Sequence, residues 1–278
     1  MHLYQKPNVT LMSLHGIRRP VTRARLVVLG SSSSGNSTLV EVGNSSALID
    51  AGFSCKELTR RLSTAGADPS DLSAIIVTHE HTDHVRGVRV LARRHDIPVF
   101  STAGTLNAAA RYLDGVRTYP RRTGESFEHG ELKITLIPVP HDAAEPAAVR
   151  LDIVDRRFLV ATDLGHFPWS LLESGQDMDA LVLESNHDEI MLENGPYPVF
   201  LKRRIRGPEG HLSNLESARA LKALLGPRTR GVLLGHLSQK NNREDVALET
   251  VLAGVPGSMR KGVDIRTTGP DRMESIEL

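Results

Sequence analysis

The chain has 278 residues, of which 40% are hydrophobic and 24% charged, a composition typical of a soluble protein with a buried core. The one cysteine, Cys55, excludes an internal disulfide framework and a multi-cysteine zinc site, and the lack of an apolar run of 18 residues excludes a membrane-spanning helix. The first 25 residues hold five basic residues and no acid, so the remainder carries 29 basic against 33 acidic residues, a balance that is not typical of nucleic-acid binding by bulk charge alone.

The N-terminal segment shows no apolar run and no cleavage site of a secretory signal. We expect residues 1–24 to form a disordered extension, with a true start at Met12 or an Arg-rich transit peptide as alternatives. Residues 25–278 are expected to form a single domain. The cysteine usage and the absence of a secretory signal favour a cytoplasmic location, with no membrane contact.

Short apolar runs and helical patterns then alternate along the chain. Strands are predicted at 25–29, 37–42, 46–49, 74–77, 99–100, 132–138, 148–154, 158–161, 180–183 and 231–234. Helices are predicted at 57–62, 86–94, 105–112, 214–225 and 243–252. Two β-rich groups, each followed by helices, favour two packed sheets with helices outside over one doubly wound sheet.

A histidine-rich run directly follows the predicted strand 74–77. His79 and His81 are two positions apart and can share a face, and Asp83 and His84 follow at the start of a predicted helix. Three imidazoles and a carboxylate in one corner suit a borderline divalent cation. The alternative, a polar turn with surface histidines, does not account for the H-x-H-x-D-H spacing.

Three further polar residues each follow a short apolar run, namely His141, Asp163 and His236. Alone, each is more often a structural or surface residue. Together with the histidine-rich run they supply five histidines and two aspartates, enough for two cations with Asp163 between them.

Several other polar segments allow more than one interpretation. The serine-rich segment 30–36 either cradles a phosphate with backbone N–H groups and hydroxyls or is a flexible polar turn. Ser213 or Asn214 can cap the helix that follows and place its N-terminus near His211, but plain capping is the favoured reading of Ser213. His211 is a surface residue, a phosphate donor or a general acid, and His187 has a similar status.

The order of these motifs resembles the metallo-β-lactamase superfamily. The segment L-I-D-A-G at 48–52, the H-x-H-x-D-H run and the three later residues together extend over nearly the whole chain. The resemblance implies an α/β fold, an αββα four-layer sandwich of two mixed β-sheets flanked by helices, with metals at one edge. It implies a first site of His79, His81 and His141, a second of Asp83, His84 and His236, a shared Asp163, and Asp50 orienting a ligand histidine.

Secondary motifs at 30–37, 141–143, 184–188, 210–214 and 235–239 are similar to those of the YycJ/WalJ-type branch of the superfamily. Members of that branch are regarded as DNA exonucleases. The resemblance therefore implies a dinuclear-metal phosphodiesterase that acts on nucleic acid, DNA rather than RNA, chiefly as a 5′-to-3′ exonuclease, with RNase or endonuclease activity as further options. A role in DNA repair is part of the same expectation.

The expected mechanism uses two divalent cations, Mn²⁺ or Zn²⁺, that activate a bridging hydroxide for attack on phosphorus. Asp83 would hold a metal and accept a hydrogen bond from the nucleophile, and His211 would stabilise or protonate the reacting group. The candidates for contact with the substrate phosphate are Ser33, Ser34, Asn36, Asn186, His187 and Ser213.

Two alternatives use the same scaffold differently. The first is a small-molecule hydrolase of the thioesterase or lactonase type, which an ester and lactone panel would reveal. The second is a non-catalytic DNA-binding protein. Presence of all seven expected ligands argues against that second reading.

Overall fold

The computed structural model describes residues 23–278, so most of the expected N-terminal extension lies outside the described residues. The first strand, β1 (Ala24–Ser32), begins one residue before the expected domain boundary, and Ala24 is already buried. Among the described residues, β1 therefore begins one residue before the strand predicted at 25–29.

One sheet combines the first half of the chain with the C-terminal strand. Its order is β14 (Glu274–Glu277), β1, β2 (Gly35–Val42), β3 (Ser45–Ile49), β4 (Ala74–Ile76), β5 (Val99–Thr102) and β6 (Thr118–Arg121). Pairing is antiparallel from β14 to β3 and parallel from β3 to β6.

The second sheet likewise has one parallel half and one antiparallel half. Its order is β13 (Asp264–Thr267), β12 (Gly231–Gly235), β11 (Ala180–Glu184), β10 (Arg156–Ala161), β9 (Ala147–Ile153), β8 (Leu132–Pro138) and β7 (Ser126–His129). The strands β10 to β13 are parallel, and β7 to β10 are antiparallel. Both sheets are thus mixed, as expected.

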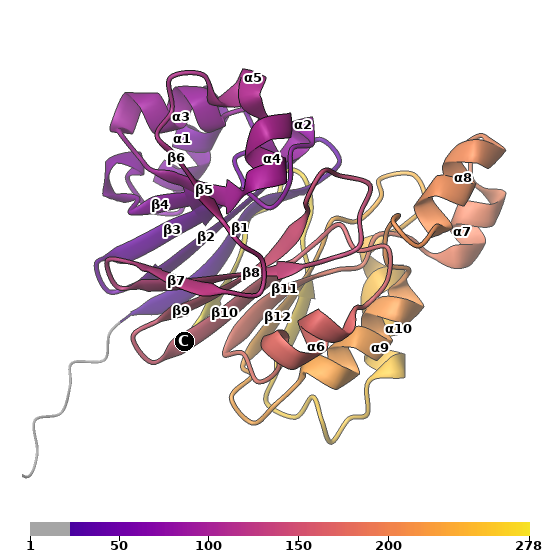
Figure 1. The fold of residues 1–278 in the computed structure, drawn as a ribbon. Helices are drawn as coiled ribbons and strands as arrows, with labels where there is room; N and C mark the ends of the chain where they lie inside the picture. Colours follow the sequence, from indigo (N-terminus) through magenta and orange to yellow (C-terminus); the bar gives the residue numbers. More distant parts are fainter. Residues whose placement is uncertain (1–22) are drawn as a thin grey trace, which may run out of the picture.

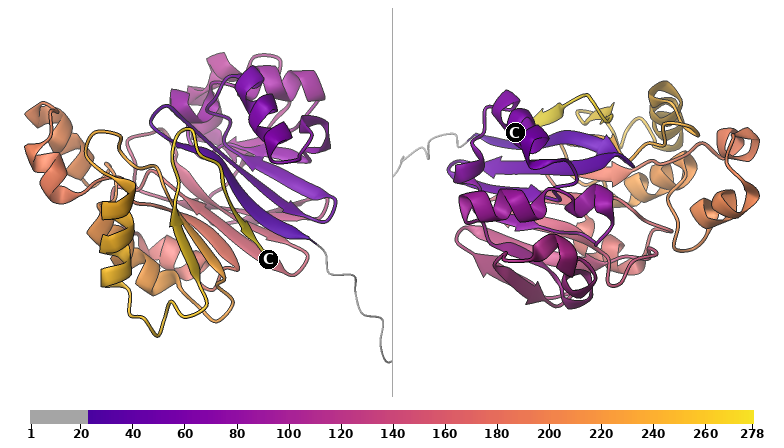
Figure 2. Two further views of the ribbon diagram at one scale, coloured as in Figure 1. Left: turned by 180° about the vertical axis from the view of Figure 1, so that it is seen from behind. Right: turned by 90° about the horizontal axis from the view of Figure 1, so that it is seen from above.

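Helices cover the two outer faces (Figure 1). The first sheet carries α1 (Cys55–Thr64), α2 (Thr82–Val85), α3 (Val88–His95), α4 (Ala103–Ala108), α5 (Ala110–Leu113) and the short 3₁₀ helix Pro69–Asp71, and the second carries α6 (Trp169–Gly175), α9 (Asn214–Leu224) and α10 (Glu244–Gly254). The pair α7 (Glu189–Asn194) and α8 (Val199–Arg206) projects from the side of the sandwich, which Figure 2 shows from two further directions. The αββα prediction is confirmed. Within residues 23–278, no helix is long and apolar enough to cross a membrane.

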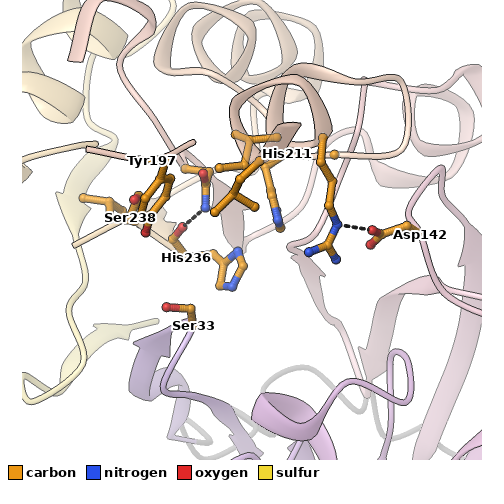
Figure 3. A pocket seen from close by; sticks show the side chains of 12 residues that line it. Ser33, Asp142, Tyr197, His211, His236 and Ser238 are labelled. Atoms are coloured by element: carbon orange, nitrogen blue, oxygen red, sulfur yellow. Dashed lines mark hydrogen bonds and ion pairs between the residues drawn. The ribbon is translucent and has the colours of Figure 1, made fainter. Parts of the chain in front are cut away.

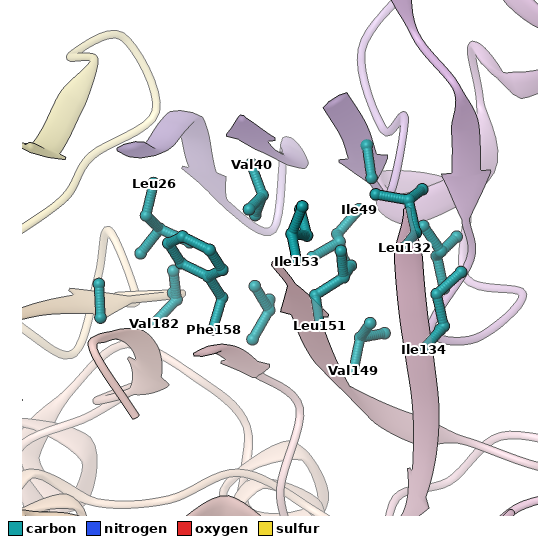
Figure 4. Close-up of a cluster of buried hydrophobic side chains, with 14 of the residues drawn as sticks. Leu26, Val40, Ile49, Leu132, Ile134, Val149, Leu151, Ile153, Phe158 and Val182 are labelled. Atoms are coloured by element: carbon teal, nitrogen blue, oxygen red, sulfur yellow. The ribbon is translucent and has the colours of Figure 1, made fainter. Parts of the chain in front are cut away.

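The core lies between the sheets (Figure 4). Leu26, Val40 and Ile49 point inward from the first sheet and meet Leu151 and Phe158 of the second. Alternate residues of the same strands point outward and pack under the helices, so both faces of each central strand are buried. This explains why these strands read as nearly continuous apolar runs.

Several elements differ from the sequence-based prediction. The edge strands β6, β7, β13 and β14 were not predicted, because their exposed positions carry polar and charged side chains that hide a strand pattern. The helices α6, α7 and α8 were also not predicted. The single helix predicted at 105–112 is two short helices, α4 and α5, that meet at Ala109.

The serine-rich segment is a hairpin and not a flexible loop. β1 continues to Ser32 and β2 starts at Gly35, which leaves Ser33 and Ser34 as the exposed turn. The Phe53 ring packs so closely against the base of this hairpin that a Cβ at Gly35 would lie 2.6 Å from it. Of the two alternatives for this segment, the flexible turn is limited to Ser33 and Ser34, because the glycine at the base of the hairpin makes room for an aromatic ring.

Candidate metal centre

The seven expected ligands come together at one end of the sandwich. His79 and His81 follow β4, Asp83 and His84 belong to α2, and the other three follow β8, β10 and β12. Because β10, β11 and β12 are parallel, the residues after their carboxyl ends meet at one edge of the sheet. The two sheets thus each deliver part of one cluster.

Close backbone packing fixes the position of α2 against the end of β3. Ala51 N donates to the His84 carbonyl at 2.8 Å, and a Cβ at Gly52 would lie 1.6 Å from the carbonyl oxygen of Asp83. Only glycine permits this approach. The segment L-I-D-A-G therefore brings the acidic and histidine side chains of α2 to the cluster.

A first group consists of His79, His81 and His141, whose candidate ligand atoms all lie within 4.8 Å of one another. The His141 Nδ1 atom lies 3.1 Å from the Gly210 carbonyl, which only accepts, so Nδ1 carries the proton and Nε2 presents a lone pair to the group. His79 Nδ1 lies 3.0 Å from the Thr78 hydroxyl, and its Nε2 atom is buried without a partner. Two lone pairs thus face one point.

A second group consists of Asp83, His84 and His236, again within 4.8 Å. His84 Nδ1 donates to Asp50 Oδ2 at 2.7 Å, which leaves its Nε2 facing the group. His236 Nε2 is buried without a hydrogen-bond partner and lies 3.7 Å from Asp83 Oδ2. Thr78 donates to Asp50 with both its backbone N–H and its hydroxyl, so Asp50 holds the His84 ring as the sequence analysis expected.

Asp163 lies between the two groups. Its Oδ2 atom is buried without a hydrogen-bond partner, 3.3 Å from His84 Nε2, and its Oδ1 atom is 3.8 Å from His141 Nε2. A buried acceptor that faces other acceptors is costly unless a cation lies among them. The donor set of imidazole nitrogens and carboxylate oxygens fits Zn²⁺ or Mn²⁺.

Three of the six non-glycine residues with positive φ in the described part of the chain lie at this edge. Asp50, Asp163 and His236 have φ values of 59°, 62° and 56°, the left-handed region that non-glycine residues rarely adopt. Such conformations cost on the order of 1–3 kcal/mol each and persist where the surroundings enforce them. The fold therefore uses part of its stability to aim these side chains.

Electrostatics divide the histidines into two kinds. Burial, together with nearby His84, lowers the pKa of His79 well below its ordinary value. For His236, burial is outweighed by the nearby carboxylates of Asp163, Asp83 and Glu184, which raise its pKa to about 10. Despite burial, His236 and His84 hold the pKa of Asp163 well below its usual range. A cation would replace protons on these rings, because ligand imidazoles must be neutral.

Glu184 is the functional residue that the sequence analysis missed. It ends β11, is fully buried, and its Oε1 atom accepts from the Nδ1 atoms of His211 and His236, both at 2.8 Å. Its Oε2 atom accepts from the backbone N–H groups of Leu164 and Leu212. The sequence analysis gave it no role, although it begins the segment 184–188 and follows the strand between those that precede Asp163 and His236.

The two predicted catalytic residues both border the cluster. Asp83 Oδ2 lies 3.3 Å from the Asn36 amide nitrogen and 3.6 Å from His84 Nε2. His211, held by Glu184, lies 3.6 Å from Asp163 Oδ1 and keeps 19% of its side chain exposed. It lines a cavity beside the cluster (Figure 3).

The six candidates for phosphate contact are not all in one place. Ser33 and Asn186 line the same cavity as His211, Asn36 contacts the ligands themselves, and Ser34 is exposed at the hairpin turn. His187 and Ser213 line a separate cavity.

Ser213 has a structural role in that place. Its hydroxyl accepts from Glu216 N, and its own N–H donates to the Glu216 carboxylate, which forms a capping box for α9. The capping interpretation is therefore confirmed, and Ser213 and His187 line a different cavity from Ser33 and Asn186. The isolated bridge between His187 and Ser213 pairs the segments before α7 and α9, and both residues line the second cavity.

Known proteins resemble the chain in sequence and in fold. Residues 46–237 match the model of a family described as the beta-lactamase superfamily domain. The exodeoxyribonuclease WalJ of Streptococcus pneumoniae is 36% identical over 252 residues, which cover 88% of this chain and 94% of that protein. The exodeoxyribonuclease YycJ of Bacillus anthracis is 35% identical over 227 residues, with coverages of 81% and 86%.

Among solved structures, the metallo-β-lactamase fold protein YhfI of Bacillus subtilis aligns with a TM-score of 0.68 over 92% of this chain and 100% of that one. The two sequences are 16% identical, so this likeness concerns the fold alone.

Proposed function

Because the chain belongs to the YycJ/WalJ branch of the metallo-β-lactamase superfamily, we propose that it is a DNA exonuclease that holds two divalent cations. The proposed direction of digestion is 5′ to 3′, in the cytoplasm, with DNA repair as the setting. Added RNase or endonuclease activity remains a prediction. The two curated relatives reported above, both named exodeoxyribonucleases, support the reaction class.

One observation carries the proposal of two cations. Three atoms from different elements, His79 Nε2, His236 Nε2 and Asp163 Oδ2, are buried without hydrogen-bond partners in the same cluster. Asp163 approaches a member of each group, with Oδ2 3.3 Å from His84 Nε2 and Oδ1 3.8 Å from His141 Nε2. His79, His81 and His141 would hold one cation, Asp83, His84 and His236 the other, and Asp163 would contact both.

Two such cations would supply an activated water and neutralise charge on the phosphoryl oxygens. The chain's own residues would do the rest. Asp83, with 21% of its side chain exposed, can accept a hydrogen bond from the attacking water and orient it. His211 donates a hydrogen bond from Nδ1 to Glu184, so its Nε2 atom is free to interact with the substrate.

His211 is suited to act as the proton donor to the leaving oxygen. The buried Glu184 carboxylate accepts a hydrogen bond from Nδ1 and fixes the orientation of the ring, which leaves Nε2 as the atom that can transfer a proton. In the same way, Glu184 orients His236 through its Nδ1 atom. One carboxylate therefore links a metal ligand to the proposed acid.

End-labelled duplex DNA, single-stranded DNA and RNA, each with Mn²⁺, Zn²⁺ or EDTA, would test the proposal. We expect metal-dependent release of mononucleotides from the 5′ end of DNA, which the position of the label reports. Release from the 3′ end would contradict the polarity alone. Failure to cleave any polymer, with hydrolysis in a parallel panel of thioesters and lactones, would replace the nuclease by a small-molecule hydrolase.

A further inference from the structure

A cavity of about 140 Å³ lies directly beside the candidate metal centre (Figure 3). His211 and His236 belong to both, so a molecule in the cavity would be in contact with the reaction centre. The opposite wall comes from the projecting α7–α8 unit, which the proposed mechanism does not use.

The lining combines apolar walls with a polar rim. Leu201 and Ile205 of α8 and Leu237 give apolar surface, and Tyr197 adds an aromatic side chain. The rim carries polar groups from Ser33, Asn186 and Ser238. Apolar faces with polar edges are the chemistry of a nucleobase, which proteins bind by stacking and by hydrogen bonds along its rim.

The size of the cavity limits what it can hold. A protein cavity of about 150 Å³ binds one benzene molecule. The 140 Å³ beside the metal centre thus suits one planar ring system and excludes a base pair. A terminal base would have to leave its partner to enter, which costs least at the end of a strand.

Tyr197 is held in place by its neighbours in the chain. It lies in the segment G-P-Y-P between α7 and α8, where Pro196 and Pro198 restrict the backbone on both sides. The side chain is half-buried at the cavity and not free in solvent. Such pre-organisation reduces the entropy lost when a ring stacks on it.

Arg204 supplies a cation between the cavity and the metal ligands. Its Nε atom donates to Asp142 Oδ2 at 2.5 Å, and Asp142 Oδ1 lies 3.4 Å from the ligand atom His141 Nε2. The guanidinium keeps 57% of its side chain exposed and can also reach a phosphate oxygen. A base in the cavity and its phosphate at the metals would therefore both have partners.

We infer, on the basis of the proposed exonuclease function, that this cavity binds the terminal nucleobase of the DNA strand and that Tyr197 is the residue on which the base stacks. Tyr197 is a positioning residue: it holds the end of the strand so that the first phosphodiester lies at the metal centre. This would favour removal of one nucleotide at a time.

The test compares duplexes that end in a normal nucleotide or in an abasic tetrahydrofuran residue. Wild-type protein should cleave the normal end faster, by about 5- to 150-fold in kcat/KM, the range given by stacking of one base. Tyr197→Ala should lose this preference and cleave both ends at similar rates. Tyr197→Phe, which keeps the aromatic ring, should show the same preference for the normal end as the wild type.

Phe200→Ala is the matched control, because Phe200 lies on α8, is 73% exposed and does not line the cavity. It should keep the wild-type preference. Bound metal content and melting temperature of each variant show that the fold and the centre are intact.

Two results would overturn the inference and leave the exonuclease in place: a wild type without preference for the normal end, or an undiminished preference in Tyr197→Ala. A wild type that cleaves no DNA would remove the proposed function, and this inference with it.

Discussion

The space between the sheets and the metal edge bury their side chains for opposite reasons. Between the sheets, Phe158 and its neighbours are apolar and satisfied by contact with each other. At the edge, His79, Asp163 and His236 are as deeply buried, yet each has an atom without a protein partner. The first region has all its partners within the chain, whereas the second leaves buried atoms that the proposed cations would contact.

Asp163 and Asp179 give the sharpest test of this contrast. Both are aspartates with 3% and 4% exposure, but Asp179 pairs with Arg228 and accepts from the Arg157 N–H, whereas Asp163 Oδ2 has no hydrogen-bond partner. Asp163→Ala should lower turnover by about 10³-fold or more, because the carboxylate is expected to contact both cations. Asp179→Ala should keep turnover and lose about 1–3 kcal/mol of unfolding free energy.

Cleavage rates and urea unfolding without metal measure the two effects. Turnover in Asp163→Ala, or inactivity of a folded Asp179→Ala protein, would remove the distinction between the two regions.

Phe158→Ala probes the core side of the comparison. The ring is fully buried between the sheets, so its removal should cost about 3–5 kcal/mol of unfolding free energy. The loss of unfolding free energy should be the same with and without metal, because no candidate metal ligand borders the cavity that the missing ring leaves. A loss that disappears on addition of metal would show that the core and the edge are coupled.

Metal removal probes the edge. At cation concentrations about 100-fold above the dissociation constant, each cation should add about 2.7 kcal/mol, so two cations should raise the melting temperature by roughly 10–20 °C. Thermal unfolding with Mn²⁺ or Zn²⁺ and with EDTA measures this rise. Asp163→Ala should show a smaller shift, and equal shifts in both proteins would contradict its place between the cations.

Glu184→Gln tests the hydrogen-bonded support behind the ligands, with a smaller expected effect. Glutamine can accept from one histidine but not hold both as the carboxylate does, so activity or metal affinity should fall about 10- to 100-fold. Glu131→Gln is the matched control, since Glu131 bonds Ser45 at 2.5 Å, away from the centre. If both variants behave alike, Glu184 has no special part in the site.

The sequence analysis predicted the cluster of candidate ligands because two features of the sequence point to it. His79, His81, Asp83 and His84 lie close together in the chain, and the later ligands each follow an apolar strand. The sandwich was predictable for a related reason, since its central strands are buried on both faces.

Glu184 has only one of these two features. A single glutamate after a strand is common, and only the parallel pairing of β11 with β10 and β12 shows that it lies among the ligands. The edge strands and the cavity at Tyr197 depend on packing between segments far apart in the chain. Their sequences are polar or rich in proline and show no hydrophobic periodicity from which a strand or a cavity could be predicted.

The metal content of the purified wild-type chain is the most direct test of the central claim. Protein loaded with Mn²⁺ or Zn²⁺, freed of excess metal and analysed by atomic emission should contain two cations per chain. One cation per chain, or none, would contradict a centre in which Asp163 lies between two metal sites.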